Sequence, residues 1–353
     1  MYAKSIAFIL PGVGINPVGG FKIIYEYANR LEKLGYKATI FYTVNMNDKS
    51  IIKNIYRFFM YYLLKKYTCK SWFKLNKNIK ETLLYYSKNE ILKYKNICLS
   101  AVTTAYNIRD FNTSSKHNIL YLVQDYEKWG TVTDEYLLTS YKFPYKKIVI
   151  SKWLQKIIND CGENAELIYN GLDFEYFKLI TPIEKRDPYS ICMLYHLDDR
   201  KRSEDAINAL YIVKKQFPKL QVNMFGTTKR PSNLPNWFIY SQRPNKEKHN
   251  EIYNNSSIFI AASKEEGFGL PPAEAMICGC AVACTNNGGF STFAKHKETA
   301  LVSEPLDYEE LAKNISILIT NYELRITIAK NGNHYIHQFT WEKAVNKFLN
   351  LLI

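Results

Sequence analysis

Short apolar runs alternate with stretches of helical periodicity through the first half of the chain. Residues 5–10 and 38–42 are apolar runs, and the first one ends at a Pro-Gly pair. Between them, apolar residues recur every three or four positions from Ile23 to Leu34, and Gly35 follows. This order predicts a strand, a glycine-containing loop, a helix and a second strand. Further apolar runs at 97–102, 119–123 and 148–150 predict more parallel strands.

The second half repeats the same alternation. The pattern predicts strands at 191–195, 220–225, 257–262 and 281–284, and helices at 203–217, 272–277, 308–319, 323–331 and 341–352. Such alternation predicts the α/β class, with two Rossmann-like domains over 1–178 and 179–340, each built on a parallel sheet. The polar stretch 179–187 is the predicted linker. Because ligands bind beyond the carboxyl ends of parallel strands, we expect the sheets to face across a cleft.

The composition is that of a globular protein with two domains of ordinary size. The chain has 353 residues, of which 47% are hydrophobic and 15% aromatic. Its seven cysteines form no C-x-x-C pair, and the first ten residues resemble a strand rather than a signal peptide. These features predict a reducing, cytoplasmic compartment. Cys278, Cys280 and Cys284 are interpreted as buried small residues, with metal binding as the alternative.

The net charge of +14 is concentrated in one segment. Residues 49–95 hold twelve Lys or Arg and only two acids, which favours an anionic partner. Within it, residues 51–66 place apolar side chains along one helical face, with basic residues beside them. Two interpretations remain open: a helix on an anionic membrane surface, or a packed helix with a solvated basic face. The segment has no run of eighteen apolar residues, so it is not expected to cross a bilayer.

The most informative segment is 263–276, which reads S-K-E-E-G-F-G-L-P-P-A-E-A-M. A buried strand is followed by a glycine-containing turn, two prolines and a helix, and proline fits the first helical turn. A helix start offers free N–H groups and a positive dipole end to a diphosphate. Gly267 and Gly269 let backbone amides approach a ligand. Glu266 in the loop and Glu274 on the helix can reach a donor's sugar and its ribose.

This string closely resembles the E-x7-E motif of family 4 glycosyltransferases, which are retaining enzymes of the GT-B fold. The resemblance implies that Glu266 contacts the donor sugar near the reacting carbon and that Glu274 hydrogen-bonds the ribose. It also implies that the amides of Phe268, Gly269 and Leu270 meet the diphosphate or the sugar. The alternative is a glycine-proline turn that only caps a helix.

Weaker matches extend the resemblance over most of the chain. They include 169–173, 287–289 and 339–342, and the last implies a closing helix over 341–353 that packs back on the N-terminal domain. The pair Gly19-Gly20 fits the family's first glycine pair, which approaches the donor phosphates or the acceptor; a plain strand-to-helix turn is the alternative. Lys201 matches the lysine that neutralises the diphosphate, and a solvated basic turn is its alternative.

The chain departs from the family pattern around this lysine. Many relatives have Gly-Arg some five residues earlier and a glycine directly after it, where this chain has Tyr195-His196 and Arg202. A guanidinium partner for the diphosphate then comes from Arg200 or Arg202, or His196 replaces it, and the choice stays open.

A second departure lies in the string V-Q-D-Y-E at 123–127. Many relatives have a histidine where this chain has Gln124. Together with M-L-Y-H at 193–196, the string resembles a subgroup that includes rhamnan-synthesis rhamnosyltransferases, which use dTDP-L-rhamnose. Asp125 or Glu127 is then a candidate to orient or deprotonate an acceptor hydroxyl. A helix-capping acid at a strand end is an equally good interpretation.

The resemblance therefore implies a retaining hexosyltransferase. It would move a sugar from dTDP-rhamnose or a UDP-hexose to a hydroxyl of a growing surface glycan, either free or linked to a lipid. No cofactor or metal is expected, because no D-x-D motif stands in the expected context. The expected location is cytoplasmic, with attachment to the inner face of the membrane if residues 49–95 bind lipid.

Two other functions were weighed against this one. A catalytically silent GT-B module that binds a glycan or a partner enzyme is disfavoured by the intact Glu266, Glu274 and Lys201. A nucleic-acid binder would explain the basic charge, but no recognised nucleic-acid motif is present. No nucleic-acid partner is therefore expected.

Overall fold

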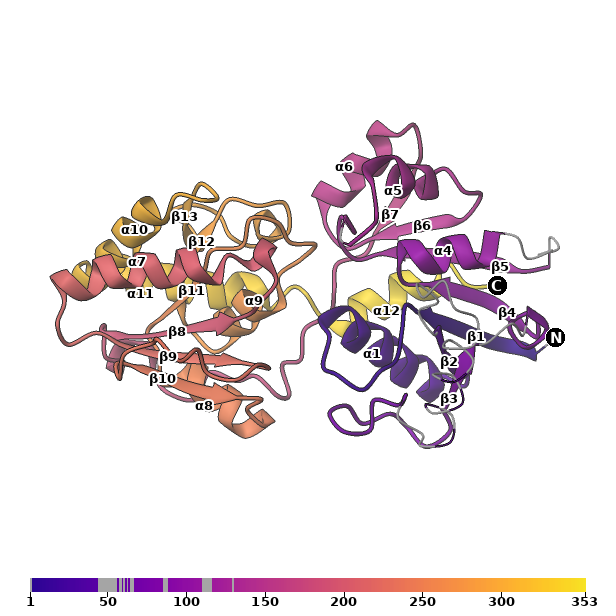
Figure 1. The fold of residues 1–353 in the computed structure, drawn as a ribbon, viewed down its shortest axis with the longest axis horizontal. Coiled ribbons are helices and arrows are strands. Elements are labelled where there is room, and N and C mark those ends of the chain that lie inside the picture. Colours follow the sequence, from indigo (N-terminus) through magenta and orange to yellow (C-terminus); the bar gives the residue numbers. More distant parts are fainter. Residues whose placement is uncertain are drawn as a thin grey trace. The chain divides into compact units, whose positions relative to one another are not determined.

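The fold was obtained as a computed structural model. It describes residues 2–43, 67–84, 88–109, 116–128 and 130–353, together with Tyr56, Phe59, Tyr61 and Leu63. The chain divides into two compact units (Figure 1). The N-terminal unit comprises Met1–Asn170 and Glu342–Ile353, and the C-terminal unit comprises Gly171–Trp341.

The N-terminal unit is built on a seven-stranded sheet in the order β3-β2-β1-β4-β5-β6-β7, and its strands pair in parallel. The strands are β1 (Tyr2–Leu10), β2 (Lys37–Thr43), β3 (Lys80–Leu84), β4 (Tyr94–Leu99), β5 (Asn118–Val123), β6 (Lys146–Val149) and β7 (Ala165–Leu167). The helices are α1 (Gly19–Lys33), α3 (Lys88–Ile91), α4 (Val102–Arg109), α5 (Asp134–Tyr141), α6 (Lys152–Asp160) and α12 (Trp341–Leu349).

Helix α1 shows how the hydrophobic pattern builds this unit. Its buried face includes Ile24, Tyr27 and Leu31, and Gly35 follows it with a φ of +84°, a conformation that glycine adopts at little cost. The ring of Phe348 on α12 packs 4.6 Å from the ring of Tyr27. The C-terminal helix is therefore part of this core, and Figure 1 draws it in yellow among the purple N-terminal elements.

The C-terminal unit is built on a six-stranded parallel sheet in the order β10-β9-β8-β11-β12-β13. The strands are β8 (Ser190–Tyr195), β9 (Gln221–Gly226), β10 (Phe238–Gln242), β11 (Ile258–Ala261), β12 (Ala281–Thr285) and β13 (Ala300–Ser303). The helices are α7 (Ser203–Gln216), α8 (Lys246–Asn254), α9 (Leu270–Ile277), α10 (Tyr308–Thr320) and α11 (Tyr322–Ile336), with short 3-10 turns η1 (Ile183–Lys185), η2 (Asp199–Lys201) and η3 (Phe290–Thr292).

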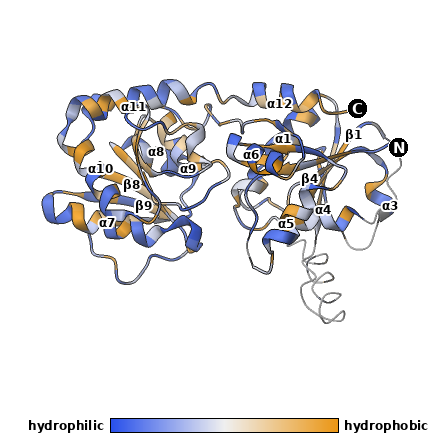
Figure 2. Cartoon of the chain, turned by 90° about the horizontal axis from the view of Figure 1, so that it is seen from above, coloured by the Kyte–Doolittle hydropathy of each residue, from blue (hydrophilic) through white to orange (hydrophobic). Residues whose placement is uncertain are grey.

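The strand order of each sheet indicates the edge at which a ligand is expected. The order reverses between β1 and β4 in the first sheet and between β8 and β11 in the second. In open α/β sheets, ligands bind at such reversal points, beyond the carboxyl ends of the strands. Apolar residues concentrate on β8 and β9, and the surrounding helices carry mixed apolar and polar turns (Figure 2). The core thus fixes the strands, while the loops after them remain available for chemistry.

The predicted α/β class with two parallel-sheet domains is confirmed, and the two compact units divide eight residues before the predicted boundary. The division falls after Asn170 rather than after residue 178. The segment that follows is held by the C-terminal unit, because the amide of Leu172 donates to the carbonyl of Phe339 and that of Ile180 to Asn254 Oδ1.

The predicted linker at 179–187 is a packed segment instead. Arg186 is 6% exposed, and its guanidinium donates to the carbonyls of Thr181, Ser256 and Cys278. These bonds satisfy a buried cation with backbone oxygens, so the segment belongs to the C-terminal core. The polar composition of residues 179–187 gave no indication that Arg186 is buried and hydrogen-bonded.

Two sequence interpretations concern membranes. The amphipathic face predicted over 51–66 lies mostly outside the described residues, of which Tyr56, Phe59 and Leu63 are helical and exposed. Within the part of the chain that the structure describes, no helix has the length and apolar character needed to cross a bilayer.

Candidate active site

Most of the residues predicted to bind the donor lie in the C-terminal unit, on the loops after β8 and β11 and on α9. These strands are neighbours at the reversal point of the sheet. The loop after β8 carries His196, Arg200 and Lys201, and the loop after β11 carries Glu266 and the glycines that precede α9. The amide of Lys264 donates to the carbonyl of Arg200 over 2.8 Å, which joins the two loops through their backbones.

Lys201 and Glu266 form an ion pair at this edge. The ammonium of Lys201 lies 2.6 Å from Oε1 and 2.7 Å from Oε2 of Glu266, so both carboxylate oxygens accept from it. The carboxylate is 10% exposed and the lysine side chain 23% exposed. Charge-assisted bonds of this kind are strong when they are partly shielded from water. The sequence prediction therefore brought together two residues that are in direct contact.

The start of α9 has few competing hydrogen-bond groups. Its N-cap is Gly269 with a φ of +96°, and a β-carbon there would come within 2.4 Å of the Phe290 ring. Pro271 and Pro272 have no N–H, so Leu270 supplies the first backbone donor of the helix. The side chain of Phe268 is buried, which leaves its backbone as the group that could face a ligand. This geometry suits an anionic group held by amides.

Glu274 lies on the inner side of α9 and is 6% exposed. Its Oε2 accepts from the hydroxyl of Tyr253 over 3.4 Å, and that hydroxyl lies 3.1 Å from Nε2 of His249. Burial, together with the charge of Glu274, raises the pKa of Tyr253 well above its ordinary value. The phenol therefore stays protonated and acts as a donor toward the carboxylate.

The two arginines next to Lys201 form ion pairs with acidic side chains close to them in the sequence. Arg200 pairs with Asp198 over 2.8 Å, and although burial acts the other way, hydrogen bonds from Arg200 lower the pKa of that carboxyl. Arg202 donates to Asp205 through Nε and Nη2 and to Asp199 through Nη1. In this chain, both candidate guanidinium groups are therefore already engaged.

Arg202 also explains how the chain does without a glycine after the lysine. Its φ of 47° is left-handed, a conformation that costs a non-glycine residue about 1–3 kcal/mol. Its ion pairs with Asp205 and Asp199 offset that cost. The departure in sequence thus preserves the backbone shape that glycine would give.

His196 completes this turn as a neutral group. Its Nδ1 accepts from the amide of Asp198 over 3.0 Å, and its backbone is bonded in both directions to the hydroxyl of Ser203. Desolvation and the charge of Lys201 lower the pKa of His196. At neutral pH the ring is therefore uncharged and leaves the cationic role to Lys201.

The N-terminal unit carries the other predicted residues. Gly19 and Gly20 begin α1, directly after the loop that follows β1. A β-carbon on Gly20 would lie 3.2 Å from Nε2 of Gln124, the residue that replaces the family histidine. The buried Oε1 of Gln124 has no hydrogen-bond partner among the described residues. The glycine pair and the 123–127 string are therefore adjacent.

The two acids of that string have different surroundings. Glu127 is 3% exposed, and its Oε2 accepts from the amide of Val102, the first residue of α4. It therefore caps a helix from within the core. Asp125 is only partly buried, and its Oδ1 accepts from the amide of Tyr126 over 2.9 Å. Of the two acids, Asp125 is the one that solvent and ligands can reach.

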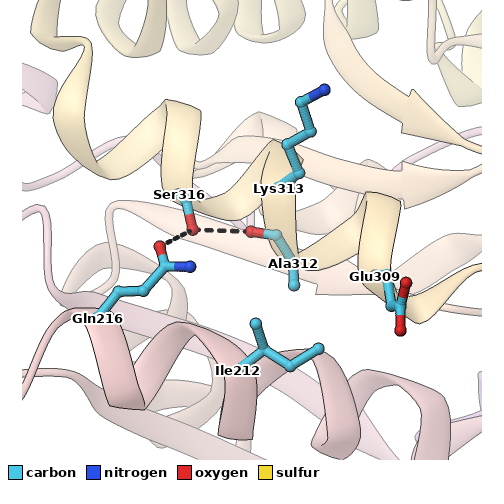
Figure 3. A pocket seen from close by; sticks show the side chains of 6 residues that line it. All are labelled: Ile212, Gln216, Glu309, Ala312, Lys313 and Ser316. Carbon is cyan, nitrogen blue, oxygen red and sulfur yellow. Dashed lines mark hydrogen bonds between the residues drawn. The ribbon is translucent and has the colours of Figure 1, made fainter.

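A shallow groove of about 400 Å³ lies elsewhere, between α7 and α10 (Figure 3). The hydroxyl of Ser316 on α10 lies 3.1 Å from Gln216 Oε1 on α7 and 2.9 Å from the carbonyl of Ala312, and its one proton can serve either acceptor. None of the predicted donor-binding residues lines this groove.

The structure also bears on metal binding. Cys278, Cys280 and Cys284 are buried and form no disulfide. Among the described residues, no three His, Cys, Asp or Glu side chains are grouped so as to hold a metal ion.

Several residues that support the site were not singled out from the sequence. Ser263 donates to Glu266 Oε1 over 2.9 Å, and Tyr253 donates to Glu274. Gly289 lies so close to Glu266 that a β-carbon would come within 2.5 Å of its carbonyl oxygen. Ser263 had one available signal, since it is a polar residue directly after a buried strand. Gly289 belongs to the 287–289 match, which did not indicate its contact with Glu266. Tyr253 had no signal, because it acts on Glu274 from a helix that is distant in sequence.

Comparisons with known proteins relate this chain to glycosyltransferases. Residues 180–335 match the family model described as "Glycosyl transferases group 1". An uncharacterized glycosyltransferase of Methanocaldococcus jannaschii is 35% identical over 210 residues, which are 57% of this chain and 57% of that protein. The capsular polysaccharide biosynthesis glycosyltransferase CapM of Staphylococcus aureus is 25% identical over 203 residues, 54% of this chain and 52% of that protein. The alignments thus span about half the length of these curated relatives.

Solved structures extend the likeness over the full length. Sucrose-phosphate synthase from Thermosynechococcus elongatus superposes with a TM-score of 0.76 and 17% identity, over 99% of this chain and 98% of that one. Anabaena HepE, in complex with UDP and glucose, gives a TM-score of 0.74 and 15% identity over 98% of both chains. These likenesses establish that the chain has the GT-B fold.

Proposed function

We propose that this chain, whose residues 180–335 match the model of the glycosyl transferases group 1, moves a sugar from a nucleotide-sugar donor to a hydroxyl of a glycan. The observation that carries the proposal is the direct contact between Lys201 and Glu266 beside the start of α9. A cation, a carboxylate and helix-start amides meet there, and glycosyl transfer with a diphosphate leaving group calls for all three.

In the proposed reaction, the protein positions the donor and stabilises the negative charge that develops on the departing diphosphate. The amide of Leu270 and the ammonium of Lys201 hold the diphosphate, which gains negative charge as the glycosidic bond breaks. Glu266 lies next to Lys201, where it can face the sugar as the anomeric carbon becomes positively charged. Glu274 is held by Tyr253 and is the candidate partner for the ribose.

The donor is proposed to be a UDP-hexose or dTDP-L-rhamnose, with retention of configuration. HepE of Anabaena has been solved in complex with UDP-glucose, and a pneumococcal O-GlcNAc transferase in complex with UDP and GlcNAc. These relatives support a UDP-sugar, and the 123–127 string supports dTDP-L-rhamnose. The acceptor is proposed to be a growing surface glycan, as the name of CapM suggests for that relative.

A release assay tests this function. The purified chain is incubated with UDP-glucose, UDP-N-acetylglucosamine or dTDP-L-rhamnose, and the freed nucleotide is measured with and without lipid-linked glycan from bacterial membranes. Release that depends on Glu266 and is stimulated by the glycan is expected. Donor binding without release from any of the three would favour a silent GT-B module instead.

We also propose that residues 49–95 attach the chain to an anionic membrane, since twelve of them are basic. Vesicles that contain anionic lipid should float with the protein at low salt and release it at high salt, because salt screens surface charge. Equal flotation with neutral vesicles would contradict this role.

A further inference from the structure

We propose that Ser263 is a positioning residue for Glu266: it keeps the carboxylate in place while Lys201 moves from that carboxylate to the donor's diphosphate. This inference rests on the proposed function and adds to it a residue and an exchange of partners. It is argued from the contacts of four neighbouring segments of the C-terminal unit.

The hydroxyl of Ser263 is aimed at Glu266 by its own backbone anchors. Ser263 is 4% exposed, and its Oγ donates to Glu266 Oε1 over 2.9 Å. Its carbonyl accepts from the hydroxyl of Thr285 and, over 2.9 Å, from the side-chain amide of Asn287. Two donors from the end of β12 therefore fix the peptide that carries the hydroxyl. A buried hydroxyl held in this way offers Glu266 a preformed donor.

The backbone of Glu266 is held from the same side. Gly289 lies against it so closely that a β-carbon would come within 2.5 Å of the Glu266 carbonyl oxygen and 2.8 Å of the Phe268 nitrogen. Asn287 Oδ1 accepts from the amide of Phe290 over 3.0 Å, which fixes the loop that carries Gly289. The 285–290 loop thus packs against the main chain of Glu266, and through Ser263 it also fixes one carboxylate oxygen of Glu266.

Lys201 is the member of this arrangement that we expect to change partners. It reaches Glu266 on a four-carbon stem, its side chain is 23% exposed, and its ammonium binds both carboxylate oxygens. A donor diphosphate carries more negative charge than one carboxylate, so it is the stronger partner for the ammonium when it binds. In the free protein, Glu266 therefore holds the ammonium of Lys201, and the diphosphate must displace Glu266 from it when the donor binds.

The contact from Ser263 gains importance once this exchange has occurred. In the free protein, Glu266 Oε1 accepts from both Lys201 and Ser263. After Lys201 has moved to the diphosphate, Ser263 still donates to a carboxylate whose side chain is 10% exposed. A buried carboxylate that loses its donors is costly and free to turn away. Removing the hydroxyl should therefore affect the donor-bound state more than the free state.

This difference predicts a split between the two kinetic constants. A hydrogen bond to a charged group corresponds to about a 10- to 100-fold effect when its loss is felt in the reacting complex. Ser263→Ala should lower kcat by about that factor and leave the donor KM within about twofold. A merely structural serine would lower the amount of folded protein and leave both constants of that fraction unchanged.

The experiment compares three variants with the wild-type chain. Ser263→Ala removes the donor group, and Ser263→Thr retains a hydroxyl at the same position. Ser257→Ala is the matched control, because Ser257 is also 4% exposed and lies at the opposite end of β11, with its hydroxyl on the carbonyl of Asp187. Nucleotide release and thermal unfolding are measured for each, with whichever of UDP-glucose, UDP-N-acetylglucosamine and dTDP-L-rhamnose the wild type consumes.

The expected result is a fall in kcat for Ser263→Ala alone, with activity restored at least in part in Ser263→Thr. Equal kcat in Ser263→Ala and Ser257→Ala would overturn the proposal. A wild-type chain that consumes none of the three donors would instead overturn the proposed function. Crystals of Ser263→Ala soaked with UDP or dTDP then decide the inference: a displaced Glu266 carboxylate supports it, and an unmoved one contradicts it.

Discussion

The loops predicted to carry function are built differently in the two units. In the C-terminal unit, side chains at the sheet edge are already bonded to one another: Lys201 binds Glu266, Glu266 binds Ser263, and Arg202 binds Asp205. In the N-terminal unit, the corresponding edge offers the backbone of a glycine pair and Gln124, whose buried Oε1 has no partner among the described residues.

This contrast teaches where recognition is preorganised. A network of paired charges holds its geometry before a ligand arrives, which suits a site that must stabilise a leaving diphosphate. A glycine pair allows close approach but fixes no partner. We therefore expect substitutions in the C-terminal unit to act on turnover, and those in the N-terminal unit to act on the fit of the substrate.

Glu266 and Lys201 give the largest expected effects. Glu266→Gln and Lys201→Ala should each lower turnover by about 10²- to 10³-fold while the chain stays folded, since each removes charge that acts in the transition state. Glu266→Gln should also bind UDP or dTDP more tightly, because Lys201 is released from its carboxylate. Calorimetric titration measures this gain, and the double variant should lose most of it. Unchanged nucleotide affinity in Glu266→Gln would contradict the competition.

Two glycine substitutions compare the units directly. Gly289→Ala should destabilise the C-terminal unit by about 1–3 kcal/mol and lower activity, because the new methyl group meets the backbone of Glu266 and Phe268. Gly20→Ala meets only the end of the Gln124 side chain, at 3.2 Å, and alanine favours helix α1 by about 0.5–1 kcal/mol. Its stability should therefore be retained or raised.

The activity of Gly20→Ala then separates the two interpretations of the glycine pair. Lost activity in a fully stable variant means that a ligand approaches this backbone. Full activity means that Gly19 and Gly20 form only a strand-to-helix turn. Thermal unfolding and nucleotide release, measured on the same preparations, supply both readings.

The acids of the 123–127 string should respond in opposite ways. Glu127→Ala leaves the buried Val102 amide without its acceptor, which should cost about 1–3 kcal/mol of stability. Asp125→Ala should cost less than about 0.5 kcal/mol, because that carboxylate is only partly buried and bonds to its own neighbour. Chemical denaturation checks both values. Asp125→Ala should lower transfer to the glycan, and an unchanged transfer rate would remove Asp125 from the list of acceptor-binding residues.

His196 gives the smallest expected effect, because its side chain is exposed. Its folded pKa lies below the ordinary value of about 6.5. As the pH falls below that value, the unfolded chain takes up a proton before the folded one, so stability should decrease. His196→Asn keeps an acceptor for the Asp198 amide and should flatten this part of the stability profile. If stability changes with pH in the same way in His196→Asn and in the wild type, the pKa of His196 is not lowered by folding.

The sequence predicted the layout of the molecule well. Apolar runs located β1, β2, β4, β5, β6, β8, β9, β11 and β12, because buried parallel strands read as continuous apolar segments. They missed β3, β7, β10 and β13, which are the strands at the edges of the two sheets. The prediction of a linker at 179–187 was wrong, because Arg186 makes hydrogen bonds to backbone carbonyls that no local sequence pattern reveals.

The candidate site was predictable in its parts but not in its connections. The 263–276 string identified Glu266 and Glu274, and the position of Lys201 followed from the family resemblance. The position of Glu266 depends on Ser263 in the same loop, on Asn287, which binds the Ser263 carbonyl, and on Gly289, which lies against the Glu266 backbone. Asn287 and Gly289 reach this loop because β11 and β12 are neighbours. Contacts across a sheet edge follow from strand order, so they became visible once the topology was known.

A crystal structure of the chain with a bound nucleotide-sugar tests the central claim most directly. The account predicts that the diphosphate lies at the start of α9, on the amide of Leu270, with Lys201 moved from Glu266 onto a phosphate oxygen. Phosphates bound far from residues 266–274, with the Lys201–Glu266 pair intact, would contradict it.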